Sequence, residues 1–253
     1  MPPVAVVHSL YRYPVKSMAA EPIPVAELSW HGLVRDRRHA FRRVGDMSGM
    51  PWLTATKLAA LVCYRPYHAG AAGDGGTLRV VTPDGEDLEA HGAALRERLS
   101  QAHGQPVELL GLKHGIYDEA PLSLISASTL MALERAAGLE LDARRFRPNI
   151  LVELASGEPF AEDSWIGHVL AFGSRGAAMI VARRDLRCPM VNVDPETAAL
   201  DLRVLRAVGR SHHAYAGVYG STFTTGTIRV GDEIHLRRLD AAPAGAPQTK
   251  RRR

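Results

Sequence analysis

Short β-type segments separated by turn residues run through most of this sequence, and they constrain the fold more than any other feature. Apolar and β-branched residues alternate or run together in each segment, and Gly, Pro, Asp or Asn ends the run. Many short strands joined by short turns favour a barrel or a curled sheet. The predicted strands span residues 4–13, 23–29, 38–44, 61–67, 77–82, 107–112, 122–125, 150–154, 169–172, 178–182, 218–224 and 227–236. The sequence therefore predicts a mainly β fold with a few helices (α+β).

The strongest helical pattern follows the predicted strand 122–125. Ser126 is suited to cap the helix, Leu130 and Leu133 share one face, and Gly138 fits the position after the last turn. Weaker helical patterns span residues 53–61, 93–102 and 200–208. The glycine-rich segment 69–76 lacks the spacing of a phosphate-binding P-loop, so we interpret it as a hairpin connection.

Composition excludes some classes of protein. The chain has 253 residues and a net charge of +4, part of which lies in the C-terminal tail, residues 241–253. We predict that this tail is disordered, and the near-neutral remainder argues against a nucleic-acid binder. The sequence contains no long apolar run, no secretory signal pattern and only two cysteines, Cys63 and Cys188. We therefore expect a cytoplasmic protein with no membrane span and no disulfide framework.

Cys188 follows a predicted buried strand and three nearby arginines, and it allows two interpretations. It is either a small buried side chain of the core or a thiolate stabilised by positive charge. A thiolate of that kind is a soft metal ligand or a nucleophile. The segment 185–195 alone does not decide between the two.

Other polar side chains form candidate anion sites at the ends of predicted strands. Lys16 and Ser17 supply an ammonium and a hydroxyl, and residues 35–38 combine three arginines with an aspartate. Arg147 and Asn149 lie two residues apart and so share one side of an extended chain. Each group is suited to a phosphate, and Arg147 with Asn149 also to the edge of a heterocycle. Each is also compatible with a solvated or salt-bridged surface.

Six motifs, taken in order, resemble the MOSC family, named for the C-terminal domain of molybdenum cofactor sulfurase, together with its N-terminal β-barrel domain. The motifs are Tyr13-Pro14-Val15-Lys16-Ser17, Gly32-Leu33 with Asp36-Arg37, Arg147-Pro148-Asn149-Ile150, Glu162-Asp163-Ser164-Trp165, Arg187-Cys188 with Asp194-Pro195, and Gly226 to Asp232. The resemblance covers residues 4–236, and the branch that it is most similar to is the mitochondrial amidoxime-reducing component with its bacterial relatives.

The resemblance implies an N-terminal MOSC β-barrel subdomain at residues 1–112 and a MOSC domain with the ligand cysteine at residues 113–240. It also implies a molybdenum cofactor, the pterin-based Mo-molybdopterin, with Cys188 as the protein ligand of the metal. Asp163 matches an acid near the metal, suited to proton transfer in catalysis. The positions that match cofactor contacts are Lys16, Ser17, Arg37, Arg147, Asn149 and Arg187.

The sequence departs from the family pattern at two places. Pro189 follows the thiol directly, and Val191-Asn192 stands where relatives often carry Thr-Thr. Glu119-Ala120 replaces two small hydroxyl residues before the predicted strand at residue 122, which removes two donors and adds a negative charge.

The function implied by the resemblance is a molybdenum-dependent reductase of N-hydroxylated or related N–O compounds. Its electrons would come from a separate donor protein of the ferredoxin or cytochrome type, because the sequence has no cysteine cluster for an iron–sulfur centre. The first alternative is a carrier of the molybdenum cofactor or of sulfur without its own redox turnover. The second is a thiol hydrolase, which needs a base such as His212 or His213.

Overall fold

The structure is a computed structural model that describes residues 2–70 and 76–239. Its strands are β1 Ala5–Arg12, β2 Glu21–Ile23, β3 Val25–Ser29, β4 Gly32–Leu33, β5 His39–Arg43, β6 Arg65–Ala69, β7 Thr77–Val81, β8 Asp87–Glu89, β9 Val107–Gly111, β10 Leu122–Ser126, β11 Ile150–Leu154, β12 His168–Phe172, β13 Ala178–Leu186, β14 Tyr215–Thr224, β15 Gly226–Arg229 and β16 Glu233–Arg238. The α-helices are α1 Ala93–His103, α2 Ala127–Ala137 and α3 Arg203–His212, and the 3-10 helices are η1 Ala59–Cys63, η2 Ala143–Phe146, η3 Ala161–Trp165 and η4 Pro189–Asn192. The predicted mainly β class is confirmed.

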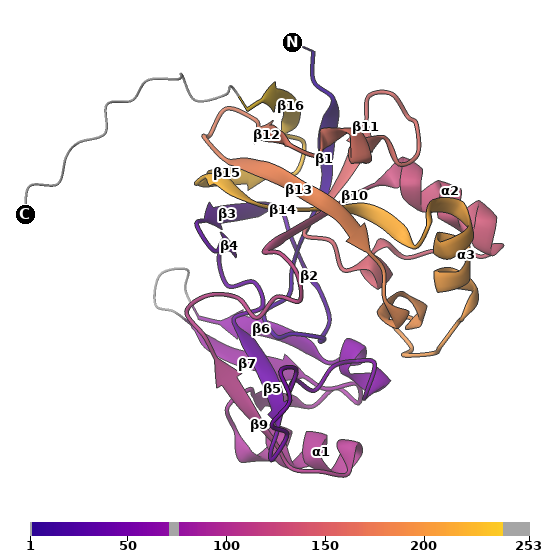
Figure 1. The fold of residues 1–253 in the computed structure, drawn as a ribbon. Helices are drawn as coiled ribbons and strands as arrows, with labels where there is room; N and C mark the ends of the chain where they lie inside the picture. Colours follow the sequence, from indigo (N-terminus) through magenta and orange to yellow (C-terminus); the bar gives the residue numbers. More distant parts are fainter. Residues whose placement is uncertain (1, 71–75, 240–253) are drawn as a thin grey trace, which may run out of the picture.

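Seven strands close into a barrel in the upper part of the molecule (Figure 1). They follow the order β11-β10-β14-β13-β12-β16-β1, and β1 then pairs with β11 to complete the ring. The pairing of β10 with β11 is parallel, while the other pairs of the ring are antiparallel. Closure satisfies the backbone donors and acceptors that an open sheet would leave at its edges.

The barrel closes around an apolar interior because alternate strand residues point inward. In β1, Ala5 and Val7 are buried, and a bulge between Val7 and Ser9 shifts the register so that Leu10 also points inward. Phe172 of β12 and Met179 of β13 fill the same core. Sequence segments from both halves of the chain thus share one hydrophobic core.

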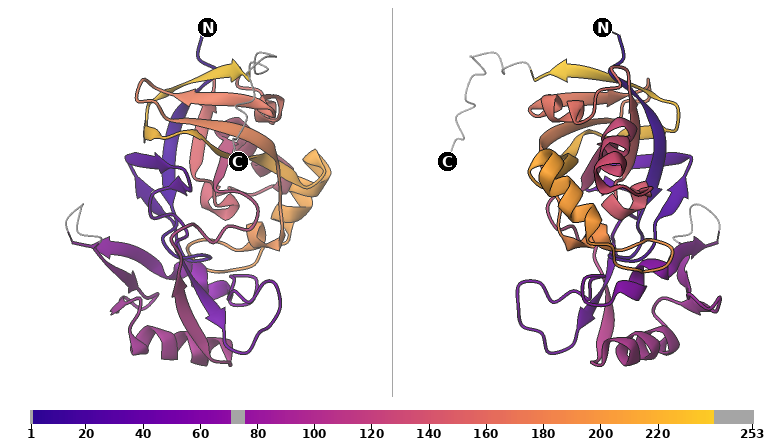
Figure 2. Two further views of the ribbon diagram at one scale, coloured as in Figure 1. Left: turned by 60° about the vertical axis from the view of Figure 1, so that its left-hand side comes forward. Right: turned by 90° about the vertical axis from the view of Figure 1, so that its right-hand side faces the viewer.

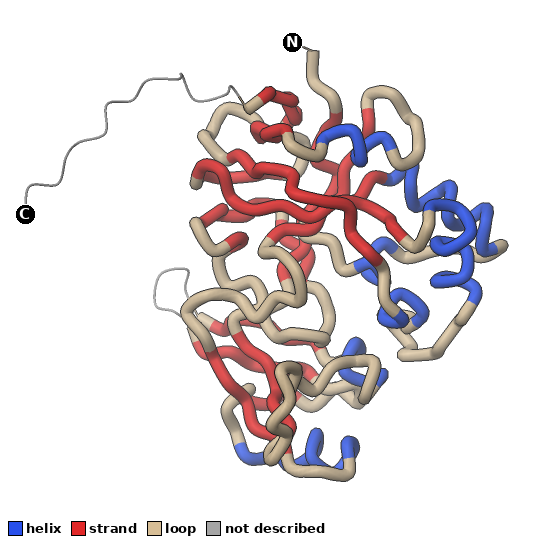
Figure 3. Tube along the Cα trace, in the orientation of Figure 1, coloured by secondary structure: helices blue, strands red, loops and turns tan. Residues whose placement is uncertain are grey.

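A second, smaller β-lobe lies below the barrel and is coloured violet to magenta (Figures 1 and 2). It contains the pair β5-β9, the sheet β6-β7-β8 and helix α1, which pack around their own apolar cluster. The chain enters this lobe after β4 and returns to the barrel after β9. The strands of both parts, and the loops that join them, are distinguished by colour in Figure 3.

Helices α2 and α3 lie side by side against the outside of the barrel (Figures 1 and 2). They bury Leu130 and Leu133 of α2 with Val204 and Val208 of α3. The predicted cap is confirmed, because Ser126 Oγ accepts from the backbone N–H of Thr129 at 3.1 Å. None of the described helices has the length and apolar composition needed to cross a membrane.

The predicted helix at residues 53–61 and the predicted strand at 61–67 are wrong in detail. The N–H of Leu53 donates to Phe41 O, which keeps this part of the chain extended, and a tight turn follows at residues 54–58. Only Ala59–Cys63 forms a 3-10 helix, and the strand begins later, at Arg65. The apolar residues here are buried in the β-lobe core. Their spacing in the sequence resembles one face of a helix, although most of the segment is not helical.

Two predicted boundaries near the C-terminus also shift. Leu200 forms an isolated bridge with Val193, and Asp201 Oδ1 accepts from Arg203 N at 3.0 Å, so α3 starts at Arg203. The segment 227–236 contains two strands because Asp232 Oδ2 accepts from Arg229 N and turns the chain. Residues 71–75 of the predicted hairpin and the tail 241–253 lie outside the described residues.

Candidate functional site: a cationic pocket and an exposed cysteine

Tyr13 lies at the centre of a cluster of cationic side chains, directly after β1. Its ring is fully buried and contacts two guanidiniums, with Arg37 Cζ 4.5 Å and Arg147 Cζ 4.2 Å from the ring centroid. Its hydroxyl donates to Pro148 O at 3.2 Å, and its N–H donates to Asp36 Oδ1 at 2.7 Å. The aromatic ring therefore holds two positive charges close together, which an anion would stabilise further.

Arg37 is oriented by a buried carboxylate and by the neighbouring loop. Its guanidinium donates to Asp36 Oδ2 at 2.5 Å, to Arg147 O at 3.0 Å and to Asn149 Oδ1 at 3.3 Å. Asp36 itself is fully buried. The charge of Arg37 is thus matched by Asp36. The hydrogen bonds of Arg37 to Arg147 and Asn149 link the loop before β5 to the loop before β11.

One guanidinium nitrogen of Arg147 has no hydrogen-bond acceptor among the described residues. Arg147 ends η2 in a left-handed conformation with φ of 51°, and its Nη1 donates to Met18 O at 2.8 Å. Its Nη2 is buried, and no group among the described residues accepts from it. Burial lowers the pKa of Arg147 to about 10, since few groups around it compensate its charge. A buried, unpartnered donor of this kind fits an anionic oxygen of a ligand.

Lys16 and Ser17 approach the same cluster from the end of β1. Lys16 is buried, and its Nζ donates to Asp118 Oδ1 at 2.7 Å and to Ile116 O at 3.2 Å. Burial lowers the pKa of Lys16, and Asp118 opposes that effect. The Asp118 side chain is 62% exposed, so solvent screens the negative charge opposite Lys16. Ser17 is buried beside Lys16 with φ of 66°.

The amide of Asn149 is used by the surrounding backbone. Its Oδ1 accepts from Ser123 N at 3.2 Å, and its Nδ2 donates to Tyr11 O at 3.2 Å. Since Arg37 also donates to Oδ1, Asn149 joins two strands to the cationic cluster. The structure brings Lys16, Arg37, Arg147 and Asn149 together, and their contact with a cofactor stays a prediction.

The side chain of Arg187 is buried and almost fully hydrogen-bonded. Its guanidinium donates to Ala216 O at 2.8 and 2.5 Å and to Phe146 O at 2.7 Å, and it pairs with Asp185 at 2.8 Å. Burial raises the pKa of Asp185 to about 6, and Arg187 opposes this shift. These contacts give Arg187 a positioning role in the structure, and stabilisation of the Cys188 thiolate by Arg187 stays a prediction.

Cys188 is exposed and directly precedes η4. The interpretation of Cys188 as a buried core side chain is therefore wrong. Pro189 occupies the first turn of η4, where a missing backbone N–H costs nothing. The buried Asn192 accepts from Leu205 N at 2.9 Å through Oδ1 and thereby fixes the first turn of α3. Pro189 and Asn192, which depart from the family pattern, thus each have a local structural use.

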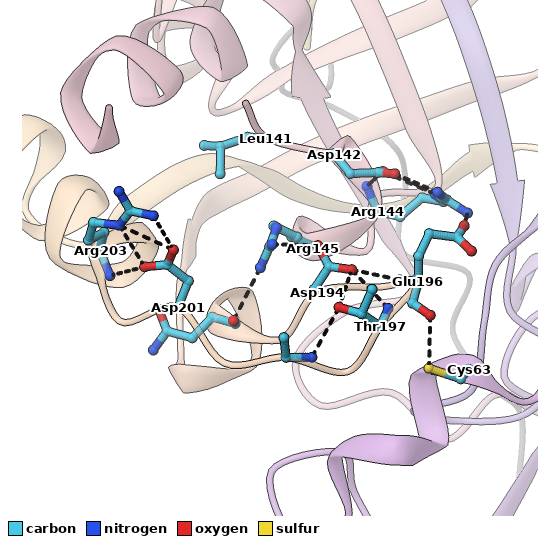
Figure 4. A network of polar contacts seen from close by, with 12 residues as sticks. Cys63, Leu141, Asp142, Arg144, Arg145, Asp194, Glu196, Thr197, Asp201 and Arg203 are labelled. Atoms are coloured by element: carbon cyan, nitrogen blue, oxygen red, sulfur yellow. Dashed lines mark hydrogen bonds and ion pairs between the residues drawn. The ribbon is translucent and has the colours of Figure 1, made fainter. Parts of the chain in front are cut away.

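The loop after Cys188 is tied to the segment that carries Arg147 (Figure 4). Arg145 is buried and pairs with Asp194 at 2.7 Å while it donates to Asn192 O at 3.1 Å. Arg144 and Glu196 form a further ion pair at 2.7 Å, and Cys63 of the β-lobe donates to Glu196 O. A pocket lies between these segments and the β-lobe. Its lining residues are Tyr13, Ala19, Ala20, Val62, Arg144, Arg145, Arg147, Met190, Val193 and Pro195.

Asp163 belongs to a different group of side chains. Its Oδ2 lies 2.7 Å from His212 Nε2 and 3.9 Å from Arg184 Nη1, while His212 stacks on Phe160. Its Oδ1 is buried without a hydrogen-bond donor among the described residues. Among the described residues, no hydrogen bond or ion pair joins Asp163 to the Tyr13 cluster, so its proposed role in proton transfer stays a prediction.

Two further observations concern Glu119 and the possible ligands of a metal. Glu119, one of the departures from the family pattern, pairs with Arg183 at 2.6 Å on the surface. The described residues contain no group of three His, Cys, Asp or Glu side chains suited to hold a metal ion. A metal at this site would therefore need ligands from a cofactor in addition to Cys188.

The fold and the pocket define the class of protein. It is a closed β-barrel with a smaller β-lobe, a pocket between them lined by arginines, and an exposed thiol two residues from the lining residue Met190. The chain belongs to the MOSC family, because the MOSC domain model matches residues 100–235 and the MOSC N-terminal beta barrel domain model matches residues 4–120. This family is associated with binding of the molybdenum cofactor.

Curated relatives agree with this assignment, and one solved structure shares the fold. Mitochondrial amidoxime-reducing component 1 of Mus musculus is 30% identical over 132 residues, and that of Homo sapiens is 27% identical over 132 residues. Each match covers 47% of this chain and 37% of the relative. The YUAD protein from Bacillus subtilis superposes with a TM-score of 0.51 at 14% identity, over 93% of this chain and 97% of that one. The resemblance found in the sequence is thereby confirmed.

Proposed function

We propose that this chain is a cytoplasmic, molybdenum-cofactor-dependent reductase of N-hydroxylated or related N–O compounds. One observation carries the proposal: the buried, unpartnered Nη2 of Arg147 lies in a cationic cluster whose pocket adjoins the loop of the exposed Cys188. An anionic phosphate would satisfy that donor, and a thiolate is the soft ligand that such a metal needs. The amidoxime-reducing components named above support this choice of substrate.

The residues of the pocket divide between anchoring and metal ligation. Lys16, Arg37 and Arg147 would hold the phosphate through charge-assisted hydrogen bonds, with Ser17 as a further donor. Cys188 would supply the protein ligand to the metal, and Asn149 would keep the Arg37 and Arg147 loops in register. When bound, the molybdenum cofactor supplies two-electron chemistry.

The reaction consumes two electrons and two protons. The N–O bond of a hydroxylamine or amidoxime breaks, the nitrogen keeps its carbon substituent and gains a hydrogen, and the oxygen leaves as water. A separate one-electron donor protein, reduced beforehand, would supply one electron in each of two encounters. Asp163 and His212 are within hydrogen-bond distance of each other and are the pair proposed to deliver protons.

The test uses the full chain purified from a host that makes the cofactor. With a reduced viologen dye as artificial donor, the wild-type protein should convert an amidoxime to the amidine, and Cys188→Ser should lose at least about 100-fold in rate. Arg42→Met, an exposed arginine of the β-lobe, serves as the control and should retain the rate. Equal rates for wild type and Cys188→Ser would contradict the proposal.

The exposure of Cys188 also supports a second function, a carrier of cofactor or of sulfur. An exposed thiol is open to transfer to another protein, and the chain then needs no turnover of its own. Added sulfane sulfur on Cys188, seen by mass spectrometry, together with bound cofactor but no dye-driven reduction, would favour this function. The thiol hydrolase gains no support, because no hydrogen bond joins Cys188 to His212 or His213 among the described residues.

A further inference from the structure

Exposed leucines lie on both sides of Cys188 along the chain. Leu186, two residues before Cys188, is 61% exposed, and Leu200 and Leu202 in the following loop are 66% and 63% exposed. Leu200 is held at this place by its bridge to Val193, directly after η4. Large apolar side chains that gather beside a functional site, rather than singly, indicate an interaction surface.

Helix α3 adds positive charge beside the same segment. Both of its ends are fixed near Cys188: Asn192 accepts from the N–H of Leu205, and Ala214, after the last turn, accepts from the N–H of Arg187. Arg203, Arg206 and Arg210 are exposed at spacings of three and four residues, so they share one helix face. Figure 2 shows α3 in orange on the outside of the barrel.

Two carboxylates beside α3 are already paired. Arg203 is matched by Asp201 at 2.6 Å, and Asp163 contacts His212 at the end of the helix. Arg206 and Arg210 have no ion-pair partner among the described residues. We name Leu186, Leu200, Leu202, Arg206 and Arg210 the leucine–arginine face. Its charge is uncompensated, and its apolar part lies next to the proposed metal ligand.

We propose that the leucine–arginine face is the docking surface for an acidic one-electron carrier protein. The inference rests on the proposed function and adds the place and the charge of the donor. An apolar centre with a cationic margin suits a brief electrostatic encounter, which is fast and weakens with salt. Each encounter oxidises one reduced carrier by one electron, so two carriers are oxidised for each N–O bond that is reduced to amine and water.

The experiment measures binding of an acidic two-iron ferredoxin to the full-length holoprotein by calorimetry at low salt. The variant Arg206→Glu/Arg210→Glu should bind roughly tenfold or more weakly than wild type. The control is Arg237→Glu/Arg238→Glu on β16, which changes the net charge by the same amount on exposed arginines away from α3 (Figure 1). That variant should bind within about twofold of wild type.

Leu202→Asn tests the apolar part of the face independently, with a smaller expected loss of about threefold to tenfold. Thermal melting curves establish that each variant is folded. Equal weakening by both double variants, or no weakening by Arg206→Glu/Arg210→Glu, would overturn the docking surface. In that case unchanged dye-driven reduction would leave the proposed function intact, whereas a wild type without dye-driven reduction would contradict the function itself.

Discussion

At the scale of single residues, the site is organised by buried cationic side chains that have few anionic partners. The Tyr13 ring contacts the guanidiniums of both Arg37 and Arg147, and only Asp36 among the contacting groups matches them with a buried carboxylate. The strand-end positions of Lys16, Arg37 and Arg147 made them candidate anion contacts, and the family resemblance implied that they contact the cofactor. The sequence indicated no role for Tyr13 or Asp185, since their importance depends on which strands become neighbours. The spacing of Asp185 and Arg187, two residues apart at the end of β13, was the available signal.

Asp185 provides a prediction about pH. Its pKa is raised to about 6 from 3.8, so the native carboxyl keeps its proton at pH values where the unfolded one is ionised. Stability from this group is therefore lost as pH rises from about 4 to 7. The unfolding free energy of Asp185→Asn relative to wild type should rise by about 2 kcal/mol over that range, measured by urea denaturation.

Asp201→Asn is the matched control, because the pKa of that partly exposed carboxyl is lowered to about 2 by its hydrogen bonds from Arg203. Its difference from wild type should stay nearly constant above pH 5. A constant difference for Asp185→Asn as well would show that Asp185 is ionised throughout and that its burial is compensated by Arg187.

At the scale of elements, periodic patterns identified most strands and the best helix correctly. The helix after Ser126 was predicted with its cap, because capping is a local interaction. The segment 53–67 was predicted poorly, since its apolar residues serve the core of the β-lobe and its backbone bonds to Phe41 O, far along the chain. The same limit applies to η2 and η4, whose mutual contact through Arg145 and Asp194 no local pattern shows.

The Arg145–Asp194 pair should be important for the loop that carries Cys188. Arg145 is buried, so Arg145→Met should lower the unfolding free energy by about 2–3 kcal/mol. A double-mutant cycle with Asp194→Asn should give a coupling of about 1 kcal/mol or more. Arg203→Met removes the exposed pair with Asp201 and should cost under about 1 kcal/mol. Equal costs for Arg145→Met and Arg203→Met would mean that the buried pair does not fix this loop.

At the scale of the whole molecule, the barrel combines strands from both ends of the chain. The barrel strand β1 comes from the predicted N-terminal subdomain 1–112 and pairs with β11 and β16 of the segment 113–240. The division of the chain into subdomains at residue 112 stays a prediction. Sequence patterns predicted a barrel or curled sheet but not its closure, because the pairing of β1 with β11 joins residues about 145 positions apart in sequence.

Closure predicts that the segment 113–239 does not fold alone. Without β1, both β11 and β16 lose a neighbour, and the apolar interior opens to solvent. The isolated segment should therefore lack a cooperative thermal transition by circular dichroism, and addition of residues 1–112 should restore it. A cooperative, monomeric 113–239 would contradict this account of the core.

The central claim is that the cationic pocket and Cys188 together hold a molybdenum cofactor, and metal content tests it most directly. Protein from a cofactor-competent host should contain close to one molybdenum per chain in the wild type. Cys188→Ala should contain several-fold less metal, and Arg147→Met should contain less metal and less pterin, because its phosphate anchor is gone. A wild type without molybdenum, or molybdenum content unchanged in both variants, would contradict the claim.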